Sequence, residues 1–324
     1  MKKKILSLIV TAALILILLS QISLDRFLKV ILTISPFWVV VGFVMYSLGY
    51  LFRAIRFRML LGDKVSLREM YPLVCLHYMA NNILPARLGE LSYIYLVKKL
   101  HRIPTAEGIA SLTIARVFDL IALSSLLFLS ALFVENVPVL IAQSFVVAGA
   151  LMLVPVIFVF FVVHGGRRFV GLVEKIFIAL NLKRFRKSEL VLEKSLEIID
   201  CFHVVKSRKV ILYTLLNSFA VWLFIYLMNF SLLKGIGMDL ALPIVILGST
   251  FSVLTNIAPV PSIASIGIYE GVWALAFISL GIPKEAAILS GFVAHIMMLV
   301  YVAVLSGMAM FVLRDKNFSP FHTG

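Results

Sequence analysis

Long apolar segments constrain the fold of this sequence more strongly than any other feature. They cover residues 5–19, 36–60, 106–134, 138–163, 210–233 and 285–313. An α-helix of about 20 apolar residues crosses the roughly 30 Å hydrocarbon core of a bilayer. In lipid, only helices and closed barrels give every backbone polar group a partner. The pattern therefore predicts an all-α protein that spans a membrane several times.

The composition agrees with lipid as the surrounding solvent. Hydrophobic residues make up 62% of the 324 residues and charged residues only 14%, against about 25% charged in soluble domains. The net charge of +14 does not indicate nucleic-acid binding, because the Lys and Arg residues flank apolar spans and form no basic face on a soluble domain. Cys75 and Cys201 provide neither a disulfide framework nor metal-ligand spacing. We expect no cofactor and no metal.

Basic clusters assign the two sides of the membrane, because short cytoplasmic loops are enriched in Lys and Arg. Three lysines precede span 5–19 and no small-residue cleavage site follows it, so we expect an uncleaved helix in the plasma membrane with a cytoplasmic N-terminus. The basic stretch 164–209 is expected to lie along the inner surface as amphipathic helices. The same rule assigns to the cytoplasmic side the basic residues near the end of span 36–60: Arg53, Arg56, Arg58, Lys64 and Arg68.

Two further apolar segments, residues 71–97 and 240–281, are interrupted near the middle. The first interruption, residues 81–90, contains Asn82 and Pro85, and the second, residues 256–262, contains Pro259. Irregular backbone persists at membrane depth only inside protein or along a wet cavity. With the sides assigned above, 71–97 enters and leaves from the cytoplasm and 240–281 from outside. Both segments are therefore predicted to be re-entrant helical hairpins.

The order of spanning helix, re-entrant hairpin and spanning helix occurs twice, in opposite orientations. Asn-x-x-Pro at 82–85 recurs at 256–259, and a basic residue, Arg116 or His295, follows twelve residues after Pro104 and Pro283. Inverted repeats with broken helices are typical of transporters. The chain then divides into a first helix with an outer loop (1–35), repeat 1 (36–137), a linking helix with a cytoplasmic segment (138–209) and repeat 2 (210–324).

The candidate substrate site begins with two half-helix N-termini. Where a helix restarts, unpaired N–H groups and the positive end of the helix dipole favour an anion. We expect one restart after Pro85. A second restart follows Pro261, with Ser262 or Ser265 as its N-cap. Two such ends converging on one site would suit a phosphate.

Buried arginines complete this predicted site. Arg87 would lie just inside the first restarted helix, and Arg116 lies in the interior of span 106–134, where ionised groups usually mark a pathway. Both are predicted to bind a phosphate through paired hydrogen bonds. Asp119 would orient Arg116, and Glu90 would orient Arg87. The alternative is that each arginine–acid pair ties helices together without binding a ligand.

Three polar residues have weaker functional interpretations. Glu270 is a candidate proton-coupling carboxylate, although it could simply lie near the outer interface. His295 is either a proton carrier or a packed, hydrogen-bonded histidine. Asn82 is included among the substrate-binding candidates, although satisfying the backbone freed at the helix break is the more ordinary role for such an asparagine.

Several of these motifs together resemble a known family. Residues 36–313 resemble the flippase-like membrane region of the lysylphosphatidylglycerol synthases. The motifs that carry the resemblance are Asn82-x-x-Pro85-x-Arg87-x-Gly89-Glu90, Arg116-x-x-Asp119, and Pro261 through Gly267-x-x-Glu270-Gly271. The second half-site departs from the family pattern, because the family commonly has a Gly-rich stretch after the proline and often an Arg at the position of His295. The resemblance implies movement of an anionic phospholipid or a polyprenyl-phosphate lipid between leaflets, without a synthase domain.

A lipid flippase that is not an enzyme is therefore the leading prediction. One alternative is an integral membrane transferase acting on a lipid-linked substrate, although no paired acidic or histidine cluster suggests its active site. Another is a non-catalytic partner of a lipid-modifying enzyme that docks through 164–209. A transporter of a small soluble anion is the third alternative.

Overall fold

Every element that the structure describes is a helix. The computed structural model describes residues 18, 20–21, 24–84, 88–135, 137–165, 171, 175, 197–202, 207–255 and 263–314. The helices are α2 (Leu24–Thr33), α3 (Pro36–Leu60), α4 (Leu67–Ile83), α5 (Glu90–His101), α6 (Thr105–Ala131), α7 (Val139–Gly165), α10 (Arg208–Gly235), α11 (Leu242–Thr255), the short 3₁₀ turn η4 (Ile263–Ser265), α12 (Ile268–Ser279) and α13 (Lys284–Arg314). The all-α prediction is confirmed for this part of the chain.

Four of the described helices are long and apolar enough to cross a membrane: α3, α6, α10 and α13. Their bounds agree with the predicted spans to within three residues. Helix α7 occupies the predicted span 138–163. Most of the predicted span 5–19 lies outside the described residues, as does most of the predicted amphipathic stretch 164–209. The loop expected before residue 36 contains helix α2.

Local sequence signals explain where the spanning helices begin and end. Helix α3 starts at Pro36, whose missing N–H costs nothing in the first turn. Ser207 accepts a 3.5 Å hydrogen bond from the backbone of Val210 at the start of α10. Helix α5 ends at His101. The next residue, Arg102, adopts a left-handed conformation, and Pro104 then precedes α6.

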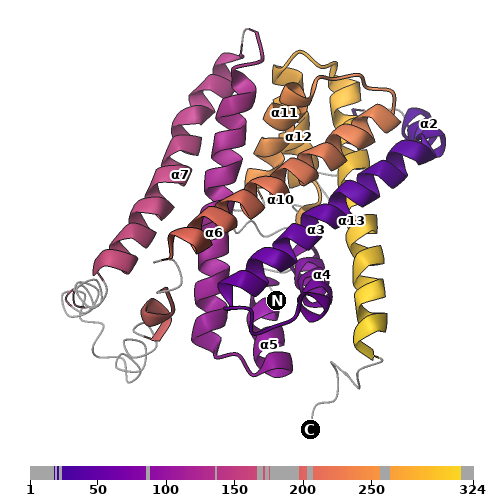
Figure 1. Cartoon of the computed structure of the whole chain (residues 1–324). Coiled ribbons are helices and arrows are strands. Elements are labelled where there is room, and N and C mark those ends of the chain that lie inside the picture. The colour runs from indigo at the N-terminus through magenta and orange to yellow at the C-terminus, as the bar shows by residue number, and fades with distance from the viewer. Residues whose placement is uncertain are drawn as a thin grey trace.

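Helices α3 and α10 cross the centre of the molecule side by side and run in opposite directions (Figure 1). The backbone N–H of Ser35, just before α3, donates a 2.9 Å hydrogen bond to the carbonyl of Gly235 at the end of α10. Further along the pair, the rings of Phe52 and Phe224 stack with centroids 5.5 Å apart. This antiparallel pair forms the axis about which the other helices are arranged.

Two pairs of short helices lie at opposite ends of the bundle, α4 with α5 and α11 with α12 (Figure 1). These four helices contain 17, 12, 14 and 12 residues, which at 1.5 Å per residue gives lengths of roughly 18 to 26 Å. None reaches the roughly 30 Å of a hydrocarbon core. The breaks predicted in segments 71–97 and 240–281 therefore separate real helices.

The packing of the first half of the bundle has a counterpart in the second half. In the first, α3 packs on α4, α4 on α5 and α5 on α6; in the second, α10 packs on α11, α11 on α12 and α12 on α13. Each last helix also reaches across: α6 packs on α10 and α11, and α13 on α3 and α4. This correspondence supports a two-repeat organisation.

Candidate functional site: a buried arginine cluster

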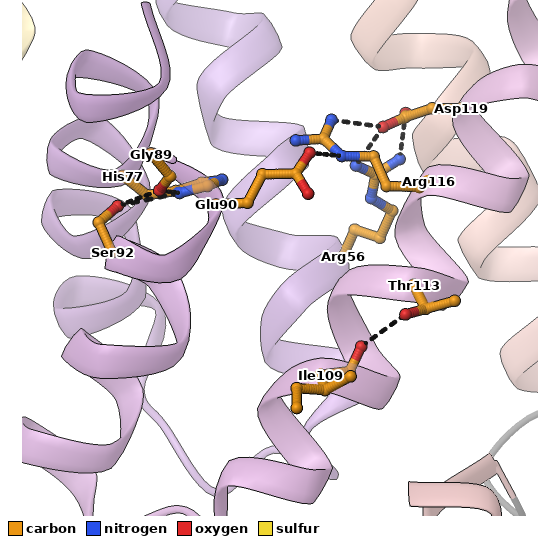
Figure 2. A network of polar contacts seen from close by, with 9 residues as sticks. All are labelled: Arg56, His77, Gly89, Glu90, Ser92, Ile109, Thr113, Arg116 and Asp119. Carbon is orange, nitrogen blue, oxygen red and sulfur yellow. Dashed lines mark hydrogen bonds and ion pairs between the residues drawn. The ribbon is translucent and has the colours of Figure 1, made fainter. Parts of the chain in front are cut away.

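A buried ion pair joins α3 to α6. The two terminal nitrogens of Arg56 contact the two carboxylate oxygens of Asp119 at 2.6 and 3.2 Å (Figure 2). From α10, Trp222 Nε1 donates to the same carboxylate at 2.9 Å, and Ser218 Oγ accepts from Arg56 at 2.6 Å. Arg56 and Asp119 are almost fully buried. Because the contacts of Asp119 with Arg56 are shorter than its contact with Arg116, Asp119 is committed first to Arg56 and only secondarily to Arg116.

Arg116 links α5 to α6. Its Nε donates to Glu90 Oε1 at 3.1 Å, and its Nη1 lies 3.6 Å from Asp119 Oδ2 (Figure 2). The predicted proximity of Arg116 and Asp119 is thus present, at ion-pair distance. Nη2 of Arg116 is buried and has no hydrogen-bond partner among the described residues. Arg116 therefore keeps one guanidinium donor for a further acceptor.

Arg53, one turn before Arg56 on α3, is the part of the cluster that the sequence analysis missed. Its side chain is 6% exposed, and its Nε lacks a hydrogen-bond partner within the described ranges. The guanidinium carbon lies 3.9 Å from the centre of the Tyr78 ring, 5.1 Å from that of Tyr50 and 5.9 Å from that of Trp222. Aromatic faces stabilise a cation, but they do not neutralise it.

The cluster carries an excess positive charge. Three guanidinium groups, on Arg53, Arg56 and Arg116, lie among two carboxylates, on Glu90 and Asp119. Both carboxylates already contact an arginine. Arg53 interacts with Asp119 only at longer range and forms no ion pair of its own among the described residues. A buried charge without a counter-charge is costly, and the arrangement is suited to an anion that supplies it.

The end of α4 and the start of α5 lie beside this cluster. His77 Nδ1 lies 3.2 Å from the carbonyl oxygen of Gly89 and 3.3 Å from Ser92 Oγ, which joins the two helices (Figure 2). Helix α5 begins at Glu90. Arg87, which was expected just inside the restarted helix, lies outside the described residues. The Asn82 side chain donates a 2.7 Å hydrogen bond to the backbone carbonyl of Tyr78 in its own helix. This is the expected role of an asparagine that gives a backbone carbonyl a hydrogen-bond partner.

A buried Glu–His pair joins α12 of the second hairpin to α13. Glu270 Oε1 lies 2.7 Å from His295 Nδ1, and Glu270 Oε2 accepts a 2.7 Å hydrogen bond from the backbone N–H of Gly267. Gly267 is the N-cap of α12. The prediction that Ser265 caps this helix is therefore wrong, because the Glu270 carboxylate reaches back to the cap. Ser262 lies outside the described residues.

The polar contacts of the two hairpins correspond in position. Tyr93 is hydrogen-bonded to Ser111 at 3.0 Å between α5 and α6, and Trp273 donates to Ser290 at 3.0 Å between α12 and α13. In each half, the aromatic residue follows the glutamate by three positions and the serine precedes the basic residue by five. The corresponding residues are Glu90 and Glu270, Tyr93 and Trp273, Ser111 and Ser290, and Arg116 and His295.

The positions of Arg53 and Arg56 overturn one step of the topology argument. Both were counted among the basic residues that place the end of this helix on the cytoplasmic side, but they are buried between helices. The sequence held a usable signal, since both lie within the apolar span 36–60 and not beyond its end. Arg58, Lys64 and Arg68 remain the basic residues that the prediction can use there.

Comparison with known proteins identifies the family. The profile described as "Lysylphosphatidylglycerol synthase TM region" matches residues 4–307, nearly the whole chain. The chain belongs to this family. The resemblance noted from the motifs is thereby confirmed, and the protein is a member of a family of multi-pass membrane regions.

Individual relatives of the lysylphosphatidylglycerol synthase TM-region family agree with this assignment. The UPF0104 membrane protein MJ1078 of Methanocaldococcus jannaschii is 29% identical over 254 residues, which cover 73% of this chain and 94% of the relative. The UPF0104 membrane protein MJ1595 of the same organism is 27% identical over 122 residues, 36% of each chain. The protein named glycosyltransferase AglD of Haloferax volcanii is 32% identical over 96 residues, 28% of this chain and 15% of that protein.

Proposed function

We propose that this protein moves an anionic lipid between the leaflets of the membrane and holds the lipid phosphate against Arg53 and Arg116. The observation that carries the proposal is Arg53, a buried guanidinium without a carboxylate partner among the described residues. The guanidinium carbons of Arg53 and Arg116 lie 3.9 and 5.9 Å from the centre of the same Tyr78 ring. A phosphate between them would accept from Arg116 Nη2 and balance Arg53.

The arrangement of the helices supports transport as the purpose of this site. The paired contacts of the two halves favour an inverted repeat, with α4–α5 and α11–α12 as re-entrant hairpins from opposite sides. Transporters with inverted repeats place their substrate near the repeat interface and expose it alternately to either side. Arg56, Asp119 and Trp222 join helices of both halves, so the cluster lies where such a substrate would bind.

A lipid fits this site better than a small soluble anion. Many large apolar side chains of the described helices are exposed, including those of α3, α7 and α13, and would face acyl or prenyl chains. The phosphate would enter the protein while the apolar tail stays in the bilayer. The two lipid classes that share this chemistry are anionic phospholipids and polyprenyl phosphates.

The second candidate is a transferase that acts on a lipid-linked substrate. The partial similarity to a protein named glycosyltransferase favours it. That similarity covers 15% of the named protein, an extent that a shared membrane segment would also explain. Under this alternative the arginine cluster would bind the same lipid phosphate, but for chemistry at one membrane face.

Leaflet exchange in proteoliposomes tests the proposal. We would follow fluorescent phosphatidylglycerol, fluorescent phosphatidylcholine and a labelled polyprenyl phosphate. Wild type should exchange at least one of the two anionic lipids, and Arg53→Met and Arg116→Met should abolish that exchange. Arg58→Met is the matched control, since Arg58 is on the same helix, is 41% exposed and pairs with the exposed Asp63.

The outcomes separate the function from the site. Exchange that depends on Arg53 and Arg116 but not on Arg58 supports both. Exchange that all three variants retain would leave a flippase and discard the arginine site. Folded protein that exchanges none of the lipids, together with product formation from a lipid-linked sugar, would favour the transferase. Uptake of inorganic phosphate by the same vesicles would favour a soluble anion.

A further inference from the structure

The Glu270–His295 pair occupies in the second half of the molecule the position that Glu90–Arg116 occupies in the first. In both, the first turn of a hairpin's second helix supplies a glutamate, and the next long helix supplies a basic partner. The flanking Tyr93–Ser111 and Trp273–Ser290 contacts keep the same spacing. The two sites therefore differ chiefly in the basic residue, arginine in one and histidine in the other.

The histidine in place of arginine changes what the second site can do. Arginine stays protonated in proteins, whereas histidine ordinarily titrates between about pH 5 and 8. We propose that Glu270 and His295 form a proton-binding site that couples proton movement to lipid movement. The proposal rests on the proposed transport function and adds its energy source.

The geometry indicates where the proton binds. With Glu270 ionised, His295 Nδ1 donates to Oε1 across 2.7 Å, while Oε2 is occupied by the N–H of Gly267. Proton binding then occurs at Nε2, and proton loss occurs from the same atom. The protonated pair is neutral overall, whereas loss of the proton leaves a carboxylate without counter-charge in a site where both residues are 1% exposed.

The described residues around the pair offer no second charge that could replace this proton. Among the described residues, the charged groups in ion-pair contact with Glu270 and His295 are each other alone. The titratable neighbours are tyrosines: Tyr269 stacks on the imidazole with centroids 4.4 Å apart, and Tyr226 of α10 and Tyr46 of α3 lie near Tyr269. Burying an uncompensated charge is unfavourable, so we infer that the closed site buries the two residues as a pair with balanced charges.

A coupling sequence follows from this preference. When α12 and α13 separate on one side of the membrane, water reaches the imidazole and a proton binds to or leaves Nε2. When the hairpin closes, the neutral pair is buried with its proton. Conversion between outward-open and inward-open forms through the closed form therefore carries one proton with it, taken from water on one side and released to water on the other. A lipid phosphate held during the same conversion moves together with that proton.

The test uses proteoliposomes with a trapped pH-sensitive dye and labelled phosphatidylglycerol or polyprenyl phosphate. For wild type, lipid exchange should depend on an imposed pH difference, by at most about tenfold per pH unit for a single titrating site, and should be accompanied by proton movement. His295→Arg should keep exchange at symmetric pH and lose both the pH dependence and the proton movement. Ser290→Ala is the control, since Ser290 belongs to the same α12–α13 contact but does not titrate.

The coupling would be overturned if lipid exchange by wild type did not depend on the pH difference, or if His295→Arg still moved protons. Either result would leave the proposed flippase function standing. Absence of exchange at symmetric pH in wild type would instead count against the proposed function. An NMR titration of labelled histidine side chains then decides the proton site by itself. A resonance that titrates between about pH 5 and 8 and is missing in His295→Arg supports it, and a His295 resonance that never titrates refutes it.

Discussion

Replacing Asp119 by asparagine should destabilise the protein strongly. Asp119 accepts hydrogen bonds from Arg56 at 2.6 and 3.2 Å and from Trp222 at 2.9 Å, and it lies 3.6 Å from Arg116. Asparagine keeps the shape of the side chain but removes its charge, which strands Arg56 between helices. Removing one partner of a buried pair typically costs about 3–5 kcal/mol in the free energy of unfolding.

The measurement is denaturant unfolding in detergent micelles, with tryptophan fluorescence as the signal. Asp63→Asn is the matched control, because the Arg58–Asp63 pair has a similar 2.8 Å contact but its side chains are 41% and 63% exposed. Such an exposed pair contributes at most about 1 kcal/mol. Adding Arg56→Met to Asp119→Asn should restore much of the loss, because the Arg56 guanidinium is no longer stranded. Equal effects of Asp119→Asn and Asp63→Asn would refute the reasoning.

Three glycine substitutions test the two hairpins by the same unfolding assay. A Cβ on Gly89 would lie 2.2 Å from the Cα of Asn81, so Gly89→Ala should cost at least about 3 kcal/mol, because backbone must move. A Cβ on Gly248 would meet ring atoms of Phe277 at 2.6 Å, so Gly248→Ala should cost about 1–3 kcal/mol. Gly271 in α12 has open space, and Gly271→Ala should be neutral or stabilise by up to about 1 kcal/mol; destabilisation there as large as at Gly89 would contradict the packing.

The spanning helices could be predicted well because their signal is local. Hydrophobic length alone located α3, α6, α7, α10 and α13 to within a few residues. Helix α2 was missed because it is short, and the interruptions in the two hairpins hid where α5 and α12 begin. Those starting points depend on tertiary contacts, such as the approach of Gly89 to Asn81, that no local pattern reveals.

The candidate site was predicted in part. Arg116 and Asp119 were found because ionised residues inside an apolar span are conspicuous. Arg53 and Arg56 were interpreted only as basic residues that mark the cytoplasmic end of their span, because they follow its most apolar part. Which side of a helix is buried depends on the packing of α6 and α10 against α3.

Pairing was the hardest feature to predict. Glu90 was assigned to Arg87, which lies outside the described residues, and the contact of Glu90 with Arg116, 26 residues away, was not predicted. The Glu270–His295 contact was likewise not predicted, although the repeat comparison had matched His295 to Arg116. Side-chain pairs between helices depend on helix rotation, which the sequence spacing of one helix does not specify.

The central claim is that a lipid phosphate binds at Arg53 and Arg116. Native mass spectrometry of the purified protein, incubated with equal amounts of phosphatidylglycerol, phosphatidylcholine and a polyprenyl phosphate, tests it most directly. The account predicts one retained anionic lipid on wild type and on Arg58→Met, and its loss from Arg53→Met and Arg116→Met. Equal retention of anionic lipid by all four proteins, or equal retention of phosphatidylcholine by wild type, would contradict it.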